Sequence, residues 1–154
     1  MKEFRYFIFF LAINFGALFL GSWLMNNGPT SEWYILLNKA PWTPPGWVFG
    51  AAWFTIMLCF SIYLAYLFKN KISRFLIILY AVQLFLNVVW NFVFFNKHLI
   101  ALGLLIIVLL TLVVFFFFFW FKKTHNKWIN FLLLPYMIWL CLATSLNAYI
   151  FLYN

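Results

Sequence analysis

Five long runs of apolar residues, separated by polar segments, make up most of the chain. Each run has about the 20 residues that a helix needs to cross the roughly 30 Å hydrocarbon core of a membrane. Lipid offers the backbone no hydrogen bonds, and the alternating polar residues of a barrel are missing, so each run is expected to be helical. We expect an all-α fold, an integral membrane bundle of five transmembrane helices in one domain over residues 1–154. The predicted spans run from about Phe4 to Met25, Gly46 to Phe68, Phe75 to Phe95, Leu99 to Phe121 and Phe131 to Tyr153.

The first run follows a charged start, Met1-Lys2-Glu3-Phe4-Arg5, as the core of a signal peptide would. Its apolar stretch exceeds the roughly 7–15 residues of such a core, and no small-residue cleavage site precedes Asn26. We therefore expect a retained helix.

The last three connectors are short: Lys69 to Arg74, Asn96 to His98 and Lys122 to Asn130. Short connections favour antiparallel neighbours, so the second to fifth helices are expected to pack sequentially. The first connector, about Asn26 to Pro45, is instead a long first loop with Trp33, Tyr34 and Trp42. Long loops are usually functional, and we expect a lid with a short helix at Ser31 and residues 33–37. The alternative is that these rings only sit at the membrane interface.

With 68% hydrophobic and 8% charged residues, the chain is excluded from the water-soluble globular proteins. Its net charge of +8 would otherwise suggest a nucleic-acid partner, but no basic cluster exceeds three residues. Only Lys39 and Lys97 lie on one side of the expected bundle. The other side carries Lys2, Arg5, Lys69, Lys71, Arg74, Lys122, Lys123 and Lys127. This bias predicts a cytoplasmic amino terminus, with the first loop and the carboxyl terminus outside.

Ionisable residues are missing from the middle of every span, which argues against proton- or ion-coupled transport. The only acids are Glu3 and Glu32, so the chain lacks the acidic side chains that a conventional hydrolase needs for catalysis. His98 and His125 lie in connectors without metal-ligand spacing, and we expect no metal and no resident cofactor. Cys59 and Cys141 are interpreted as small buried hydrophobes.

The third span carries amide side chains on the face that is expected to point into the bundle. Gln83, Asn87 and Asn91 recur every four residues and share one helix face, with Trp90 and Phe94 beside it. Facing lipid, unpaired amides would cost several kcal/mol each, so they should point inward. They can be interhelical hydrogen-bonding groups or a polar strip in a ligand cavity, and the neighbouring rings favour the cavity slightly.

The fifth and second spans carry comparable inward stripes. The fifth has Tyr136, Trp139, Ala143, Leu146 and Asn147, and the second has Phe49, Trp53 and Met57. The fourth is mostly aliphatic, with Thr111 and the run Phe115 to Phe119, and should be exposed to lipid or fill space. Gly46 and Gly50 form a GxxxG pattern, a weak dimer signal.

Several of these motifs together resemble the translocator protein (TspO/MBR) family, which includes the bacterial tryptophan-rich sensory proteins and the mitochondrial peripheral benzodiazepine receptor. The similarity covers nearly the whole chain. It is carried by Trp42-Thr43-Pro44-Pro45-Gly46, Trp53, Asn87, Trp90-Asn91, and the Pro135-Tyr136 to Asn147 stripe.

The resemblance implies a receptor in a bacterial cell membrane that binds porphyrins such as protoporphyrin IX, benzodiazepine-site ligands and, in animal members, cholesterol. It also implies light-dependent porphyrin breakdown involving Trp53 and Trp139, and a homodimer. Passive transport of apolar ligands and a membrane scaffold are the alternatives. The implied lining is Tyr34, Pro44, Trp53, Asn87, Trp90, Asn91, Trp139, Ala143 and Leu146, to which the helical stripes and loop aromatics add Trp42, Phe49 and Met57.

Two features depart from the family pattern. The chain ends Tyr149 to Asn154 without the closing basic residue of the cholesterol motif, which argues against sterol recognition through it. Trp90 and Phe94 are bulky for the wall of the third span, so the pocket is expected to be narrower.

Overall fold

Helices account for nearly all of the chain in the computed structural model, which describes residues 2–70, 72–121 and 127–154. Five of them are long and apolar enough to cross a membrane, and the described residues include no strand, which confirms the predicted all-α bundle. The long helices are α1 (Lys2–Leu24), α3 (Gly46–Asn70), α4 (Arg74–Asn91), α5 (Ile100–Phe121) and α7 (Leu134–Tyr153). The short elements are η1 (Gly28–Thr30), α2 (Glu32–Leu36), η2 (Phe92–Asn96), α6 (Lys127–Asn130) and η3 (Phe131–Leu133).

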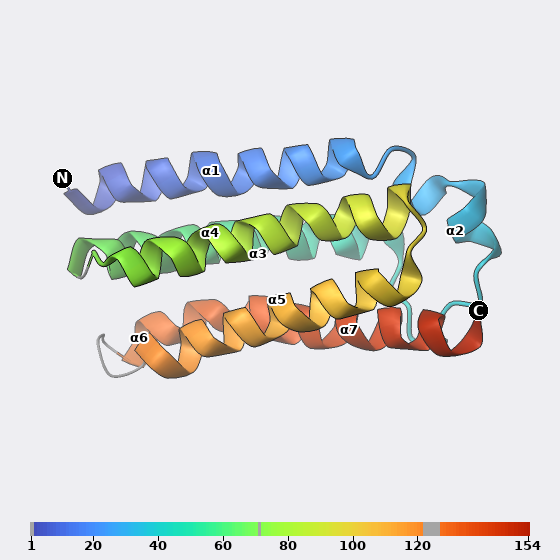
Figure 1. The fold of residues 1–154 in the computed structure, drawn as a ribbon. Coiled ribbons are helices and arrows are strands. Elements are labelled where there is room, and N and C mark those ends of the chain that lie inside the picture. Colours follow the sequence, from blue (N-terminus) through green and yellow to red (C-terminus); the bar gives the residue numbers. More distant parts are fainter. Residues whose placement is uncertain (1, 71, 122–126) are drawn as a thin grey trace.

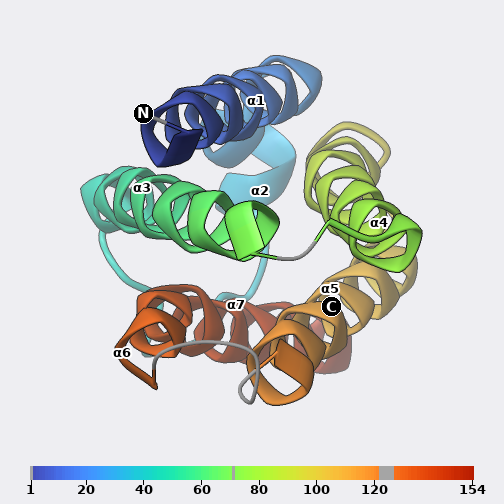
Figure 2. The same ribbon diagram turned by 90° about the vertical axis from the view of Figure 1, so that its left-hand side faces the viewer.

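The long helices form a closed ring in an order that differs from the chain order (Figure 2). α1 packs against both α3 and α4, α4 against α5, α5 against α7, and α7 against α3. The prediction that the second to fifth spans pack sequentially is therefore wrong at one place, because, among the described residues, the backbones of α3 and α4 do not lie side by side and the two helices meet through rings such as Phe60 and Tyr80. The short connector fixes only their antiparallel directions, and the first span is inserted beside both.

A buried amide explains why α1 takes this position. The Asn14 side chain is 1% exposed and donates to Ser61 Oγ on α3 at 2.9 Å. Its oxygen accepts from Tyr80 Oη on α4 at 2.8 Å. Because lipid could satisfy neither group, these hydrogen bonds tie the first span to both neighbours.

The two ends of the bundle differ in charge and in the segments that lie over them (Figure 1). Lys2, Arg5, Lys69 and Arg74 lie at the end that holds the amino terminus, whereas α2 and the carboxyl terminus lie at the opposite end. Of the other residues in the charge prediction, Lys71, Lys122 and Lys123 lie outside the described residues, as does His125.

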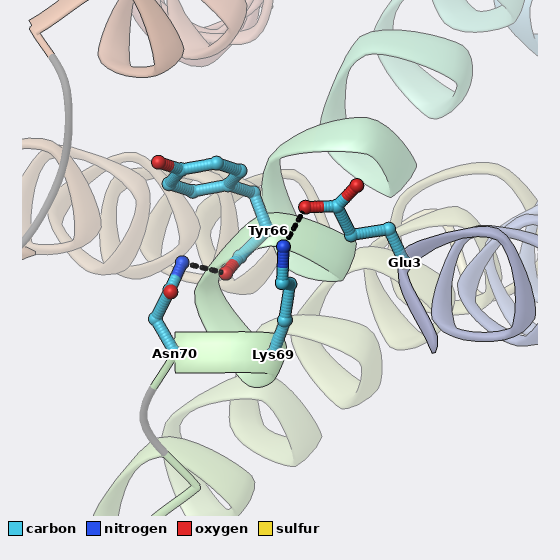
Figure 3. Close-up of polar contacts among 4 residues, drawn as sticks. All are labelled: Glu3, Tyr66, Lys69 and Asn70. Carbon is cyan, nitrogen blue, oxygen red and sulfur yellow. Dashed lines mark hydrogen bonds and ion pairs between the residues drawn. The ribbon is translucent and has the colours of Figure 1, made fainter. Parts of the chain in front are cut away.

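One ion pair joins α1 to α3 at the basic end, between Glu3 and Lys69 (Figure 3). Beside it Asn70 Nδ2 donates to the Tyr66 carbonyl oxygen at 2.7 Å. Both partners of the ion pair are about half exposed, so the pair contributes little to stability.

The two cysteines differ from the expectation that both are buried. Cys141 is exposed on α7 and Cys59 is only half-buried, so the prediction that both are buried is wrong. An apolar run carries no periodic signal that separates the lipid face from the core face, since both are apolar. On α5, Thr111 contributes a contact to α7, with Thr144 Oγ1 at 3.1 Å from its hydroxyl.

We expect Asn14→Leu to destabilise the bundle by about 1–2 kcal/mol, because Tyr80 loses its acceptor and Ser61 its donor. Unfolding in mixed detergent micelles would measure the change. Asn70→Leu is the control, since Asn70 is exposed and its side chain bonds within its own helix among the described residues, and it should stay within about 0.5 kcal/mol. Equal effects of the two variants would contradict the role of Asn14.

Candidate functional site

A cavity of about 240 Å³ lies inside the bundle, at the end opposite the basic residues. It is enclosed by α1, α3, α4, η2, α5 and α7, and η1 reaches it from the first connector. The lining residues are Leu18, Ser22, Met25, Pro29, Phe49, Gly50, Trp53, Trp90, Asn91, Phe95, Ile107, Trp139 and Ala143. Five of these thirteen carry aromatic rings, so flat apolar surface dominates the wall.

One wall is built by rings from α3 and α7. Phe49 and Trp139 meet edge to face, with ring centroids 5.1 Å apart. Trp53, one turn after Phe49, meets the buried Tyr136 in the same way at 6.0 Å. Ala143 follows Trp139 by one turn, and its small side chain leaves space beside the indole. The helical spacing thus places two indoles on the same cavity.

The opposite wall combines a ring stack with amides. Trp90 stacks on Phe94 with centroids 5.5 Å apart and planes 9° apart. Its Nε1 donates to Asn147 Oδ1 at 3.3 Å, which holds the indole across to α7. Asn91 Nδ2 donates to the carbonyl oxygen of Asn87 at 3.1 Å, and the Asn91 side chain lies against Gly21 of α1. A Cβ on Gly21 would come within 2.7 Å of that amide nitrogen, so glycine permits this close approach.

The π-helical turn η2 shapes the end of the cavity. Five-residue turns of this kind often interrupt helices at functional sites. Here the turn buries Phe94 and Phe95, and Phe95 lines the cavity. The extra residue redirects rings that a regular helix would place elsewhere.

The first connector folds over this end of the bundle. Ser31 Oγ accepts from the Tyr34 backbone N–H at 3.3 Å and caps α2, which confirms the short helix predicted there. Trp33 stacks on His98 with centroids 4.1 Å apart and planes 12° apart. Tyr34 packs on Phe95 at 5.3 Å, and burial raises the pKa of its phenol, so it stays neutral.

Two further anchors hold the rest of the connector. Asn38 N–H donates to Asn154 Oδ1 at 2.9 Å, and Asn38 Nδ2 donates to the Tyr153 carbonyl at 3.1 Å. Trp42 Nε1 donates to Ser145 Oγ at 3.1 Å on α7. The connector is thus tied to the end of the bundle by stacking and hydrogen bonding.

The model of the TspO/MBR family matches residues 8–153. The chain belongs to the TspO/MBR family. Among curated proteins it is 35% identical over 120 residues to Protein CrtK of Rhodobacter capsulatus, covering 75% of this chain and 74% of that one. It is 33% identical to the Tryptophan-rich sensory protein of Cereibacter sphaeroides, over 75% of this chain and 73% of the relative. With the human Translocator protein the identity is 30%, over 90% of this chain and 83% of the relative.

In this member of the TspO/MBR family, the cavity brings together half of the residues predicted to bind ligand. They are Phe49, Trp53, Trp90, Asn91, Trp139 and Ala143. Tyr34 lies in the connector above Phe95, and Trp42 is 52% exposed beside Ser145. Pro44 stands just before α3 and does not line the cavity. Met57, Asn87 and Leu146 are buried behind the wall.

Sequence reasoning missed the contribution of the first span, in which Leu18 and Ser22 of α1 and Met25 just after it line the cavity. Polar residues are too sparse in this span for its pattern to mark one face as cavity-lining. Pro29 and Gly50 were also missed, although Gly50 had been noted for its spacing from Gly46. Phe95 and Ile107 complete the missed set.

Proposed function

We propose that the protein is an integral membrane receptor that binds porphyrins, such as protoporphyrin IX, and benzodiazepine-site ligands in this cavity. The observation that carries the proposal is the pair of indoles, Trp53 and Trp139, facing one cavity inside the bundle. Membership of the TspO/MBR family and the match to a protein named Tryptophan-rich sensory protein support it.

The chemistry of the wall suits a flat apolar ligand. Aromatic rings bury large areas and stack on other π systems with ring centroids about 4.5–7 Å apart. The amide of Asn91 offers a polar group at the edge of the cavity. The other predicted binding residues act indirectly in this proposal. Tyr34, Trp42 and Pro44 position the first connector, which covers this end of the bundle. Met57, Asn87 and Leu146 support the cavity wall from behind.

The size of the cavity sets a condition on binding. Its 240 Å³ is below the roughly 300–1,000 Å³ of pockets for drug-sized ligands. A macrocycle therefore needs the wall to widen, and we propose that Trp90 moves away from its stack on Phe94. The 3.3 Å bond from Trp90 to Asn147 is long for an N–H donor, so it opposes this movement only weakly.

A second candidate function is light-dependent porphyrin breakdown. Both indoles of the cavity are oxidisable side chains next to the space that the macrocycle would fill. An excited porphyrin that takes one electron from Trp53 or Trp139 becomes a radical anion and leaves an oxidised indole radical. Molecular oxygen then accepts that electron and forms superoxide, which attacks the macrocycle. These steps need neither a metal nor a carboxylate from the protein.

We also propose that the basic end of the bundle faces the cytoplasm. Lys2, Arg5, Lys69 and Arg74 gather there, and Lys and Arg in short loops favour the cytoplasmic side. The cavity and its cover then face outward, toward the extracytoplasmic side of the membrane.

Titration of purified protein with protoporphyrin IX, followed by tryptophan fluorescence, tests the binding proposal. We expect saturable quenching that weakens at least tenfold in Trp139→Ala, because the wall loses an indole. Trp120→Ala is the matched control, since Trp120 is 61% exposed on α5 and far from the lining. Similar affinities of the two variants would refute the site assignment.

Illumination of the porphyrin complex tests the second candidate. The porphyrin absorption band should decay at least five times faster with the wild-type protein than with the Trp53→Phe/Trp139→Phe double variant, because phenylalanine is far harder to oxidise than tryptophan. Dark samples and Trp120→Phe serve as controls. Equal decay in wild type and double variant would leave binding as the function.

Single cysteines test the orientation. In a background with Cys59→Ala and Cys141→Ala, Glu32→Cys in α2 should react with a membrane-impermeant maleimide on intact cells. Asn70→Cys, at the basic end, should react only after the membrane is opened. The reverse pattern would contradict a cytoplasmic amino terminus.

A further inference from the structure

Three residues of the cavity lining are exposed at the outer surface of the bundle. They are Ser22 on α1, Pro29 in η1 and Gly50 on α3, whereas Trp139, Ala143, Phe95 and Ile107 are buried. Each of the three exposed residues touches the cavity on one side and the surface on the other, so the wall there is no more than one residue thick. We infer that the cavity opens sideways at this thin place, between α1 and α3 and beneath η1.

The opening lies near the outer end of the two helices. Ser22 is two residues before the end of α1, and Gly50 is four residues after the start of α3, or about 3 and 6 Å along the helix axes. Trp23 and Trp47 beside it are 71% and 75% exposed, and such indoles commonly mark the membrane interface. At this depth an amphiphilic ligand keeps its apolar rings in lipid and its charged groups among the headgroups.

The glycine at the opening has a different role from the one its spacing suggested. A Cβ added to Gly50 would meet no described atom within 4 Å, and the same holds for Gly46 one turn earlier. Neither glycine is therefore needed for close packing inside this chain. Only Gly50 lines the cavity, where its missing side chain widens the opening.

The other approaches to the cavity are closed by rings. A lipid-facing groove between α3 and α7, lined by Ala51, Thr55 and Ile138, ends on Trp139, which is 7% exposed and packed on Phe49. From the end of the bundle, Trp33 stacked on His98 and Tyr34 packed on Phe95 close the cover.

We propose that the opening formed by Ser22, Pro29 and Gly50 is a lateral entry site, through which flat amphiphilic ligands pass from the outer leaflet into the cavity. The inference rests on the proposed function, because it takes the ligand to be a porphyrin that dissolves in the bilayer. Gly50 is then the residue whose size sets which ligands enter.

Binding kinetics in lipid vesicles test the entry site, with protoporphyrin IX supplied in the bilayer and tryptophan quenching followed by stopped flow. A side chain that blocks the opening slows entry and exit alike. We expect Gly50→Leu to lower the association and dissociation rate constants at least fivefold each. Ser22→Leu, from the facing helix, should reproduce this pattern.

Gly46→Leu is the matched control, because it makes the same substitution on α3 in equally open space without lining the cavity. It should leave both rate constants within twofold of wild type. If Gly50→Leu only raises the dissociation rate, Gly50 is part of the binding wall and the entry site is refuted. Unchanged rates in Gly50→Leu, with altered rates in Trp33→Ala, would show that ligands enter beneath the first connector. This result would also overturn the lateral entry site.

Tryptophan quenching of the wild-type protein shows whether a failed test concerns the entry site alone or the proposed function as well. Saturable quenching in wild type with Gly50→Leu behaving like Gly46→Leu would overturn the entry site alone. Absence of saturable quenching in wild type would overturn the proposed function and the entry site with it. Thermal unfolding of each variant in the same vesicles confirms that the compared proteins are folded.

Discussion

Polar groups inside the membrane must find partners within the bundle, because lipid offers none, and the rest of this structure depends on that constraint. Asn14 meets it by bonding to Ser61 and Tyr80, which places α1 between the helices that follow it in the chain. Gln83 on α4 likewise donates to Tyr136 Oη on α7 at 2.8 Å. These polar contacts join α1 to α3 and α4, and α4 to α7.

The outer half, which holds the cavity, is lined mainly by rings. Phe49, Trp53, Trp90 and Trp139 build its wall, and the space between their rigid side chains is the cavity. The two halves meet where Tyr136, held by Gln83, supports the edge of Trp53. Gln83 Oε1 finds no partner among the described residues, so this junction retains unused hydrogen-bonding capacity next to the site.

The cover and the lateral opening complete an arrangement that suits capture of a membrane-dissolved ligand. Trp33 and Tyr34 seal the aqueous end with stacked rings, and the hydrogen bonds between Asn38 and Asn154 hold the connector to the last helix. The wall beside Ser22 and Gly50 is open by comparison. Under the proposed function, such an arrangement lets the protein meet its ligand in the bilayer rather than in water.

The sequence by itself determined the five spans, the collection of charge at one end, the short helix after Ser31, and the indoles and amides that turn inward. Those features follow from hydropathy and local periodicity, which act within one segment. Tertiary structure alone decided that α1 separates α3 from α4, that Asn87 and Met57 lie behind the wall while Asn91 lines it, and that Cys141 faces outward. Each of these depends on which helices meet, and an isolated polar residue in a largely apolar span, such as Asn14 in α1 or Thr111 in α5, does not specify its partner from the sequence.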